Sequence, residues 1–200
     1  TKVTETVRKT GETTTYDAPQ RIDYDNMQLD RSVVNRDQIR KVLTAYKKAI
    51  YEELYPEREK NWEYIPKTLI FAKDDNHASE IVEGVKDVFK SEFENEEVPE
   101  HFVQKITYSS GYSNGLIRDL RTEKDFRVAV TVTLVATGTD VRPLEVVLFM
   151  KDVRSDVLYT QMKGRGCRII SDDKLREVTP NANTKECYYI VDGVGVTEQD

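Results

Sequence analysis

Cysteine, glycine and long apolar runs are all scarce in this 200-residue chain. Its two cysteines, Cys167 and Cys187, show no CxxC or Cys/His spacing, which excludes a disulfide-rich scaffold and the usual kind of zinc site. No run approaches the roughly 18 apolar residues of a membrane-spanning helix. The first residues also lack the basic and apolar segments of a secretory signal. We therefore expect a cytoplasmic chain with no membrane partner.

Positive charge is in the minority. The chain has 30 Lys and Arg against 36 Asp and Glu, a net charge of −6, so it lacks the overall basic character of many nucleic-acid-binding domains. Any site for a polyanion is therefore expected to be a local patch. Hydrophobic residues make up 38% and charged residues 33%, which is typical of a globular domain with a heavily solvated surface. Because the sequence does not begin with Met, we expect it to be a segment of a longer protein.

Apolar spacing predicts strands that alternate with helices. Residues 1–18 are rich in β-branched residues around a glycine, which predicts a hairpin. Apolar residues at helical spacing predict a long amphipathic helix from Asn35 to Tyr55. Further strands are expected over residues 68–72, 102–108, 126–135, 146–150 and 188–192, with helices over 78–89, 116–120 and 155–162 and an acidic loop over 91–100.

The later strands show little polar and apolar alternation, as in parallel strands that are covered on both faces. Strands of this kind between helices predict an α/β fold with a parallel β-sheet flanked by helices on both faces. Such sheets bind ligands at the carboxyl ends of their strands, so functional residues are expected just after strands. A weak composition shift near residue 60 divides the chain into a peripheral hairpin and helix, 1–60, and a main domain, 61–200.

The first candidate site follows the strand that ends near Val135. The chain enters a turn of small and hydroxyl residues, with Gly138 before Asp140. Backbone N–H groups and hydroxyls in such a turn suit phosphate oxygens, and the carboxylate can accept from a ribose hydroxyl. An ordinary turn in which Asp140 caps a neighbouring segment has the same pattern, so both interpretations stay open.

The second candidate site runs from Gln161 to Arg168 and holds two arginines, Arg165 and Arg168, with a glycine on each side of Arg165. Arginine grips phosphate well because its planar fork is always charged and binds through two hydrogen bonds. Basic residues outnumber acidic ones between residues 142 and 168, which makes a local positive patch in an acidic chain. A surface ion-pair network beside a glycine helix cap is the alternative.

Taken together, these stretches resemble the second RecA-like domain of superfamily 2 helicases and translocases. The strand 68–72, the Gly-x-Asp turn and the Gln-x-x-Gly-Arg-x-x-Arg stretch match that superfamily's motifs IV, V and VI in order. The residues around them, at 141–145, 151–155, 161–166 and 190–197, resemble the motor (R) subunit of type I restriction-modification enzymes. The resemblance extends from about residue 67 to residue 197.

The resemblance implies one half of an ATP-driven motor. In the family, ATP and Mg²⁺ lie between two RecA-like domains, and the first domain supplies the P-loop and the acidic metal-binding motif. This chain contains neither GxxxxGK[ST] nor DExH, so it matches only the second domain. By motif position, Arg168 corresponds to the arginine finger, Arg165 to a second γ-phosphate contact and Gln161 to an assisting residue. Gly138 and Asp140 correspond to residues near the ribose and the network that couples hydrolysis to movement.

The resemblance also implies partners. The motor moves along double-stranded DNA, whose backbone would face Lys73, Thr131, Thr133 and Thr137. Thr133 departs from the family pattern, which often has Asp at that position. Other expected partners are the first RecA-like domain and the nuclease domain of the same parent chain, and the methyltransferase and specificity subunits of the complex. Residues 1–60 would then be peripheral or a linker to the preceding motor domain.

Two alternatives remain beside the restriction motor. One is another superfamily 2 helicase, for example in DNA repair. The other is a non-catalytic RecA-like module that only binds nucleic acid or a partner. The presence of Gln161, Arg165 and Arg168 favours a motor, because a binding module has no need for both arginines.

Other residues invite a functional interpretation but carry weaker patterns. His77 and His101 have no Ser, Cys or carboxylate at catalytic spacing, so we expect ordinary surface histidines. Trp62 could stack on bases, although aromatic residues beside a helix end more often pack against a sheet.

Overall fold

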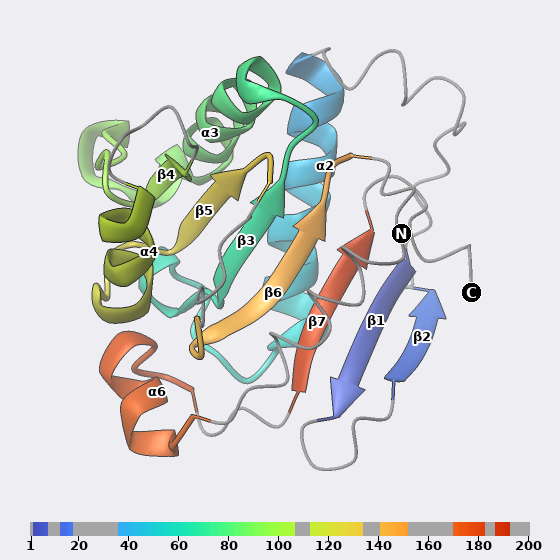
Figure 1. Ribbon diagram of the computed structural model, residues 1–200, viewed down its shortest axis with the longest axis vertical. Coiled ribbons are helices and arrows are strands. Elements are labelled where there is room, and N and C mark those ends of the chain that lie inside the picture. The colour runs from blue at the N-terminus through green and yellow to red at the C-terminus, as the bar shows by residue number, and fades with distance from the viewer. Residues whose placement is uncertain are drawn as a thin grey trace.

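The computed structural model describes residues 2–7, 13–17, 36–106, 113–133, 141–151, 170–182 and 187–192. These residues form one seven-stranded sheet with the order β2-β1-β7-β6-β3-β5-β4 (Figure 1). The strands are β1 (Lys2–Val7), β2 (Thr13–Asp17), β3 (Lys67–Phe71), β4 (Val103–Ile106), β5 (Val128–Thr131), β6 (Leu144–Phe149) and β7 (Cys187–Asp192).

The described helices flank this sheet. They are α2 (Arg36–Ala49), α3 (Asp75–Phe89), α4 (Ser113–Thr122) and α6 (Asp172–Val178). Shorter helical segments are the π-helix η1 (Ile50–Leu54) and the 3₁₀ turns η2 (Trp62–Tyr64), η3 (Lys90–Glu92) and η4 (Glu94–Glu96). No helix in the described part of the chain is long and apolar enough to span a bilayer.

Five neighbouring strands, from β4 to β7 across the sheet, run parallel. The N-terminal hairpin extends the sheet antiparallel, because β1 pairs with β7 and β2 pairs with β1. The structure thus confirms the predicted α/β fold with a parallel sheet and an N-terminal hairpin at its periphery. The division of the chain near residue 60 stays a prediction.

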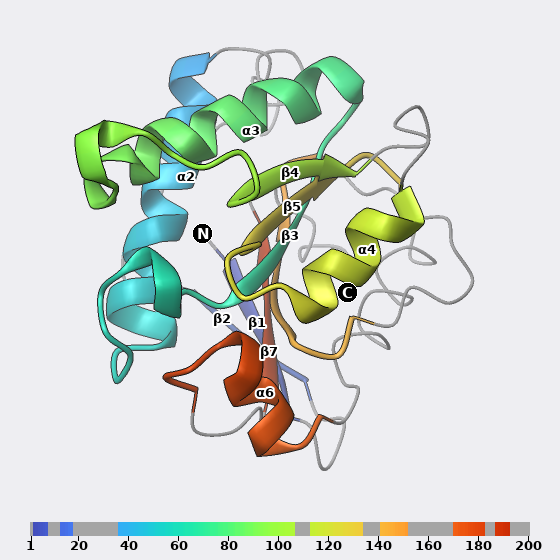
Figure 2. The same cartoon turned by 90° about the vertical axis from the view of Figure 1, so that its left-hand side faces the viewer.

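Both faces of the parallel sheet are covered, which explains why its strands show so little alternation. On one face, Ile70 and Leu148 pack with α2 and α3; on the other, Leu69 and Val147 pack with residues of α4. Figure 2 shows the sheet edge-on, with α2 and α3 on one side and α4 on the other. All five residues of β3 and all six of β6 are buried.

The predicted elements mostly match those observed, with differences at their ends. The strand expected over residues 126–135 is shorter, because β5 ends at Thr131. The long helix does reach Leu54, but its last turn is π-helical. Helix α6 was not predicted, and the expected acidic loop contains two 3₁₀ turns. The helix predicted over 155–162 lies outside the described residues.

Candidate functional site

The ends of β3, β5 and β6 lie side by side at one edge of the sheet. The backbone N–H of Ala72 donates to the carbonyl of Thr131 at 2.7 Å, and that of Met150 donates to the carbonyl of Phe71 at 3.0 Å. These bonds join the three strands at their last residues. We call this region, residues 71–73, 131–133 and 149–151, the carboxyl edge.

Lys73 leaves the carboxyl edge beside the start of α3. Its side chain is exposed, and its backbone N–H donates to Nδ1 of His77 at 3.0 Å. Asp74 caps α3 by accepting from the backbone N–H of His77 at 2.8 Å. A short helix-capping turn therefore fixes the place of Lys73 relative to the strand end.

The expectation that His77 is a surface residue was wrong. Its side chain lies under the capping turn and only 3% of the residue is exposed. Burial lowers the pKa of His77 to about 4, although the nearby carboxylate of Asp74 acts to raise it. The imidazole is therefore neutral near pH 7, which leaves Nδ1 free to accept the bond from Lys73.

The two threonines predicted to face DNA differ in exposure. Thr131, the last residue of β5, is 1% exposed, whereas Thr133 is exposed. In a continuous strand, side chains two residues apart point to the same side, so Thr131 and Thr133 would be equally buried if β5 continued. Their different exposure arises because β5 ends at Thr131. Thr133 is therefore the one of the two whose side chain lies at the surface of the described structure.

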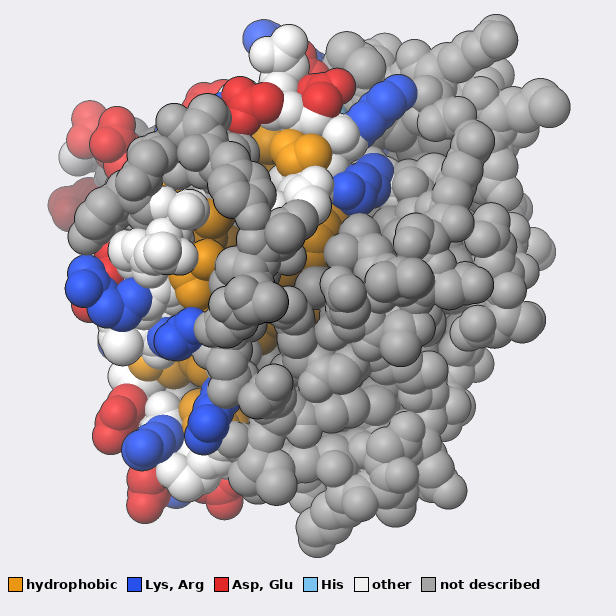
Figure 3. All heavy atoms as spheres, in the orientation of Figure 1, with side chains coloured by type: hydrophobic (Ala, Val, Ile, Leu, Met, Phe, Trp, Pro, Cys, Tyr) orange, Lys and Arg blue, Asp and Glu red, His pale blue; other side chains and the backbone are white. Residues whose placement is uncertain are grey.

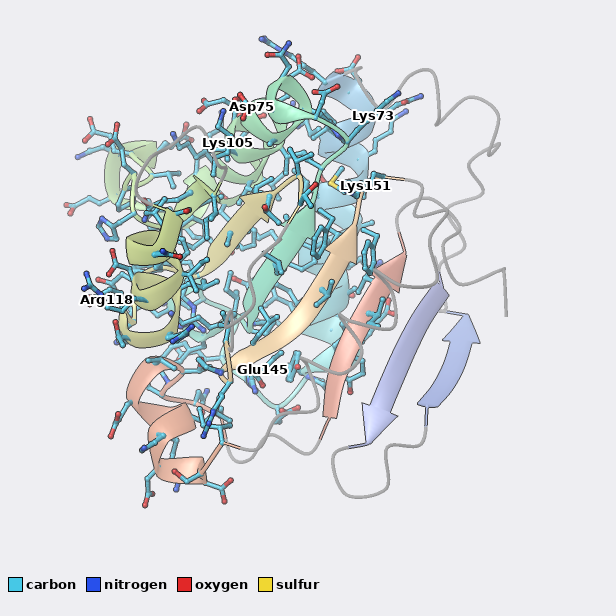
Figure 4. The ribbon with its side chains drawn as sticks, in the orientation of Figure 1. Lys73, Asp75, Lys105, Arg118, Glu145 and Lys151 are labelled. Carbon is cyan, nitrogen blue, oxygen red and sulfur yellow. The ribbon has the colours of Figure 1, made fainter. Side chains whose placement is uncertain are left out.

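Lys151 follows β6 and reaches over the end of β3. Its Nζ donates to the backbone carbonyl of Val132 at 2.5 Å and lies 5.7 Å from the ring centroid of Phe71. The side chain is half-buried, and this desolvation lowers its pKa. In Figure 4, Lys73 and Lys151 are labelled on the same side of the sheet, where β3 and β6 end.

Lys105 of β4 also lies near this side of the sheet, but its charge is already paired. Its Nζ contacts a carboxylate oxygen of Asp75 at 2.8 Å and donates to the hydroxyl of Ser79 at 3.0 Å. In Figure 3, acidic and basic side chains are interspersed near the top of the view, where β3, β5 and β6 end. The described residues at this end of the sheet therefore form no continuous basic surface.

The predicted nucleotide-contacting residues lie outside the described residues, as does one of the residues predicted to contact DNA: Gly138, Asp140, Gln161, Arg165, Arg168 and Thr137. Their positions in the chain can still be related to the structure. Residues 134–140 continue directly from Thr133, and residues 152–169 continue directly from Lys151. Both segments thus start from the carboxyl edge.

A buried charge cluster that the sequence did not reveal lies at the opposite, amino edge of the sheet. Glu145 of β6 is 1% exposed and binds Arg58 through two bonds, of 3.0 Å to Nη1 and 2.6 Å to Nη2. The guanidinium of Arg58 also covers the ring of Tyr55 at 3.9 Å. Although burial acts to lower the pKa of Arg58, the Glu145 carboxylate raises it overall.

Two further buried basic side chains, those of Lys67 and Arg127, donate mostly to backbone carbonyls. The acceptors of Arg127 are the carbonyls of Ile65, Lys124 and Val178 and the hydroxyl of Thr179; those of Lys67 are the carbonyls of Glu123 and Phe126. Burial lowers the pKa of Arg127 to about 10 and that of Lys67 to about 6. At neutral pH Arg127 is thus charged and Lys67 mostly neutral.

Apart from Ile65, these acceptors lie at the carboxyl ends of α4 and α6 or in the turns that follow them, where the charged Arg127 interacts favourably with the helix dipole. The cluster therefore ties the ends of two helices to the starts of three parallel strands. Since open α/β sheets bind ligands at the carboxyl ends of their strands, we assign these residues to stability.

Trp62 also contributes to packing, because it stacks on Phe93 with ring centroids 4.9 Å apart.

The described residues offer no metal centre of their own. No group of three or more His, Cys, Asp or Glu side chains in the described part of the chain is placed to hold a metal ion.

Known proteins resemble this chain in part. No protein-family model matches it. The endonuclease subunit of the type I restriction enzyme EcoKI from Escherichia coli (strain K12) is 30% identical over 132 residues, which cover 64% of this chain and 11% of that subunit. A solved fragment of an HsdR subunit of a type I restriction enzyme from Vibrio vulnificus YJ016 has a similar fold, with a TM-score of 0.58 and 19% identity, over 88% of this chain and 30% of that one. The chain thus spans 11% of the length of the curated relative that it matches.

Proposed function

Because this chain is homologous over part of its length to the endonuclease subunit of type I restriction enzymes, we propose that it is the second RecA-like motor domain of such a subunit. In this proposal the domain contributes to an ATP-dependent translocase that moves along double-stranded DNA in the cytoplasm. The nuclease activity belongs to another domain of the same parent chain. The methyltransferase and specificity subunits are the further partners of the complex.

The observation that carries the proposal is the arrangement of the carboxyl edge. Backbone bonds hold the ends of β3, β5 and β6 together there. In open α/β sheets this edge is where ligands bind. The segments that hold the Gly-x-Asp turn and the arginine pair both continue from it, at Thr133 and Lys151. Two stretches 20 residues apart in sequence thus start from neighbouring strand ends.

ATP is the substrate of the proposed motor. Its P-loop and Mg²⁺ ligands would come from the first RecA-like domain, since this sequence contains neither motif. From this chain, Arg168 would act as the arginine finger and Arg165 as a second γ-phosphate contact, with Gln161 assisting. Gly138 and Asp140 would lie near the ribose. A finger arginine stabilises charge on the transferred phosphoryl group and is worth about 10³ to 10⁵ in rate.

DNA would bind through phosphate contacts. Lys73 is exposed at the carboxyl edge and supplies positive charge, while Thr133 is an exposed hydroxyl donor beside it. Thr137 is proposed for the same role. Thr131 is buried, so we leave its side chain out of the proposed contact surface.

Two other functions would use the same fold. A different superfamily 2 helicase, for example in repair, would lack the restriction nuclease elsewhere in the parent chain. A non-catalytic RecA-like module would bind nucleic acid or a partner without needing both arginines. By itself, the 200-residue chain should behave like such a module, with no ATPase and with weak, salt-sensitive DNA binding.

The test is DNA-stimulated ATP hydrolysis by the full-length protein assembled with its partner subunits. Arg168→Ala should lower turnover about a thousandfold or more while nucleotide stays bound, because the finger acts on the transition state. Arg168→Lys should restore little, since lysine lacks the planar fork. Arg176→Ala is the matched control: Arg176 lies on α6 and pairs with exposed Asp173. Near-normal ATPase in Arg168→Ala would favour the binding module instead.

A further inference from the structure

Lys151 makes a contact that the proposed roles do not use. It follows β6, and its Nζ donates to the carbonyl of Val132, which follows β5. These two strands are not neighbours, because β3 lies between them. The side chain therefore reaches past the end of β3 to bind a backbone atom that follows the strand on its far side.

The path of this side chain is well defined. Its ammonium group lies 5.7 Å from the ring centroid of Phe71 at the end of β3. That ring in turn stacks on Phe149 of β6, with centroids 5.1 Å apart and planes 14° apart. The ammonium group of Lys151 thus lies near a buried, stacked pair of aromatic rings, and this contact favours the position that it occupies.

The bond also has a strong enthalpic basis. A charged donor forms stronger hydrogen bonds than a neutral one, and the half-buried environment of Lys151 reduces the competition from water. Among the described residues, Val132 provides the hydrogen-bond acceptor that Lys151 uses. The ladder bonds of β5 with β3 end at Thr131, where its carbonyl accepts from Ala72. Lys151 therefore holds the first residue beyond that ladder.

We propose that Lys151 is a positioning residue that clamps the exit of β5 to the exit of β6 across β3. The two exits lead to the segments that hold Gly138 and Asp140 on one side and Arg165 and Arg168 on the other. The clamp fixes where these segments start relative to each other. This inference rests on the proposed motor function, because the clamp has a functional purpose only if both segments serve one nucleotide site.

The clamp predicts a specific kinetic signature in the full-length protein with its partner subunits. Lys151→Met keeps the length and apolar stem but removes the donor. A misplaced catalytic group affects the transition state more than ground-state binding, and displacements of about 1 Å cost on the order of 100-fold. We expect the kcat for DNA-stimulated ATP hydrolysis to fall about 10- to 100-fold, with the KM for ATP changed less than about threefold.

Conservative rescue separates positioning from folding. Lys151→Arg keeps a charged donor long enough to cross β3, and should recover kcat to within about fivefold of the wild type. Lys151→Gln stays polar but is too short to reach Val132, so its kcat should fall as far as that expected for Lys151→Met. It provides a second test of the clamp if the methionine variant folds poorly. Lys124→Met is the matched control, because Lys124 is a partly exposed lysine that pairs with Glu63 away from the carboxyl edge.

Arg168→Ala, measured in the same assay, keeps the two proposals distinguishable. If Arg168→Ala is inactive while Lys151→Met and Lys151→Gln keep the wild-type kcat, the motor assignment stands and the clamp is overturned. Equal losses in the Met, Gln and Arg variants would also overturn it, since the donor would then not matter. If Arg168→Ala stays active, the motor assignment fails and the clamp fails with it.

Discussion

His77 is buried next to the carboxyl edge, although an isolated histidine in a charged sequence gave no sign of it. Its Nδ1 accepts the backbone N–H of Lys73, and its Nε2 has no hydrogen-bond partner among the described residues. A protonated ring would lose the bond from Lys73 and would place a positive charge at a buried position, where desolvation outweighs the attraction of the Asp74 carboxylate. The neutral ring is therefore part of the turn that leads from β3 to α3.

This arrangement predicts an acid-sensitive turn. The folded-state pKa of about 4 lies below the ordinary value of 6.5. The unfolded chain thus binds the proton more readily, and stability falls as the pH drops from 6.5 towards 4. His77→Asn keeps an acceptor near the position of Nδ1 but does not titrate. Between pH 6.5 and 4, the unfolding free energy of this variant should therefore fall by about 1 to 3 kcal/mol less than that of the wild type. Urea unfolding at several pH values measures this, and parallel pH profiles would contradict it.

Sequence alone identified the candidate site residues by type but not their surroundings. Lys151 was part of a predicted basic patch, yet it is half-buried and bound to a carbonyl. Lys67, Arg127 and Glu145 were unremarkable in the sequence, because charged residues are rarely fully buried. Their burial depends on carbonyls and side chains that tertiary structure brings from distant positions, such as the 87 residues that separate Arg58 from Glu145.

Helices α2 and α3 cross at a glycine, and this contact sets how closely they pack. A Cβ atom on Gly84 would lie 2.9 Å from Cδ1 of Leu43 and 3.1 Å from Cγ2 of Ile39. Both of those side chains are 1% exposed. Close packing around them leaves little room to move, although both contacts are to the ends of side chains.

Substitutions at Gly84 should therefore depend on size. Gly84→Ala gains about 1 kcal/mol in helix propensity and loses a similar amount to crowding, so its net effect should be near zero or slightly destabilising. Gly84→Leu has nearly the same propensity gain but cannot fit, and should lower the free energy of unfolding by about 2 kcal/mol or more. Chemical denaturation measures both. Equal stability of the two variants would show that α2 and α3 can separate without cost.

Elements with long, periodic apolar patterns were predictable and those without were not. The patterns of α2 and α3 were strong, because each presents several buried residues at helical spacing, whereas β3 was recognisable as a continuous buried run. Helix α6 has only seven residues, of which Leu175 and Val178 are buried, so it offers too little periodicity. β5 is shorter than predicted for a tertiary reason as well. Its pairing with β3 and β4 ends at Thr131, opposite the last residues of both neighbouring strands.

At the scale of the whole molecule, the sheet joins the two ends of the sequence. Six residues of β1 pair with six of β7, so residues 2–7 lie against residues 187–192. The sequence predicted the hairpin but not its partner, because strand pairing over nearly the full chain length leaves no local signal. With the hairpin in place, β2 and β4 are the outermost of the described strands and β7 is internal.

Removal of residues 1–17 should turn β7 into an edge strand. Its amides that now pair with β1 would then lose their acceptors and should exchange hydrogen at least about tenfold faster. The exposed edge should also promote self-association. Exchange measured by mass spectrometry on peptides that cover residues 187–192 tests the first effect, with β3 as an internal control because it keeps both neighbours. Light scattering tests the second. Unchanged protection of β7 would mean that the hairpin does not cover it in solution, and that the parallel strands alone set the stability of this side of the sheet.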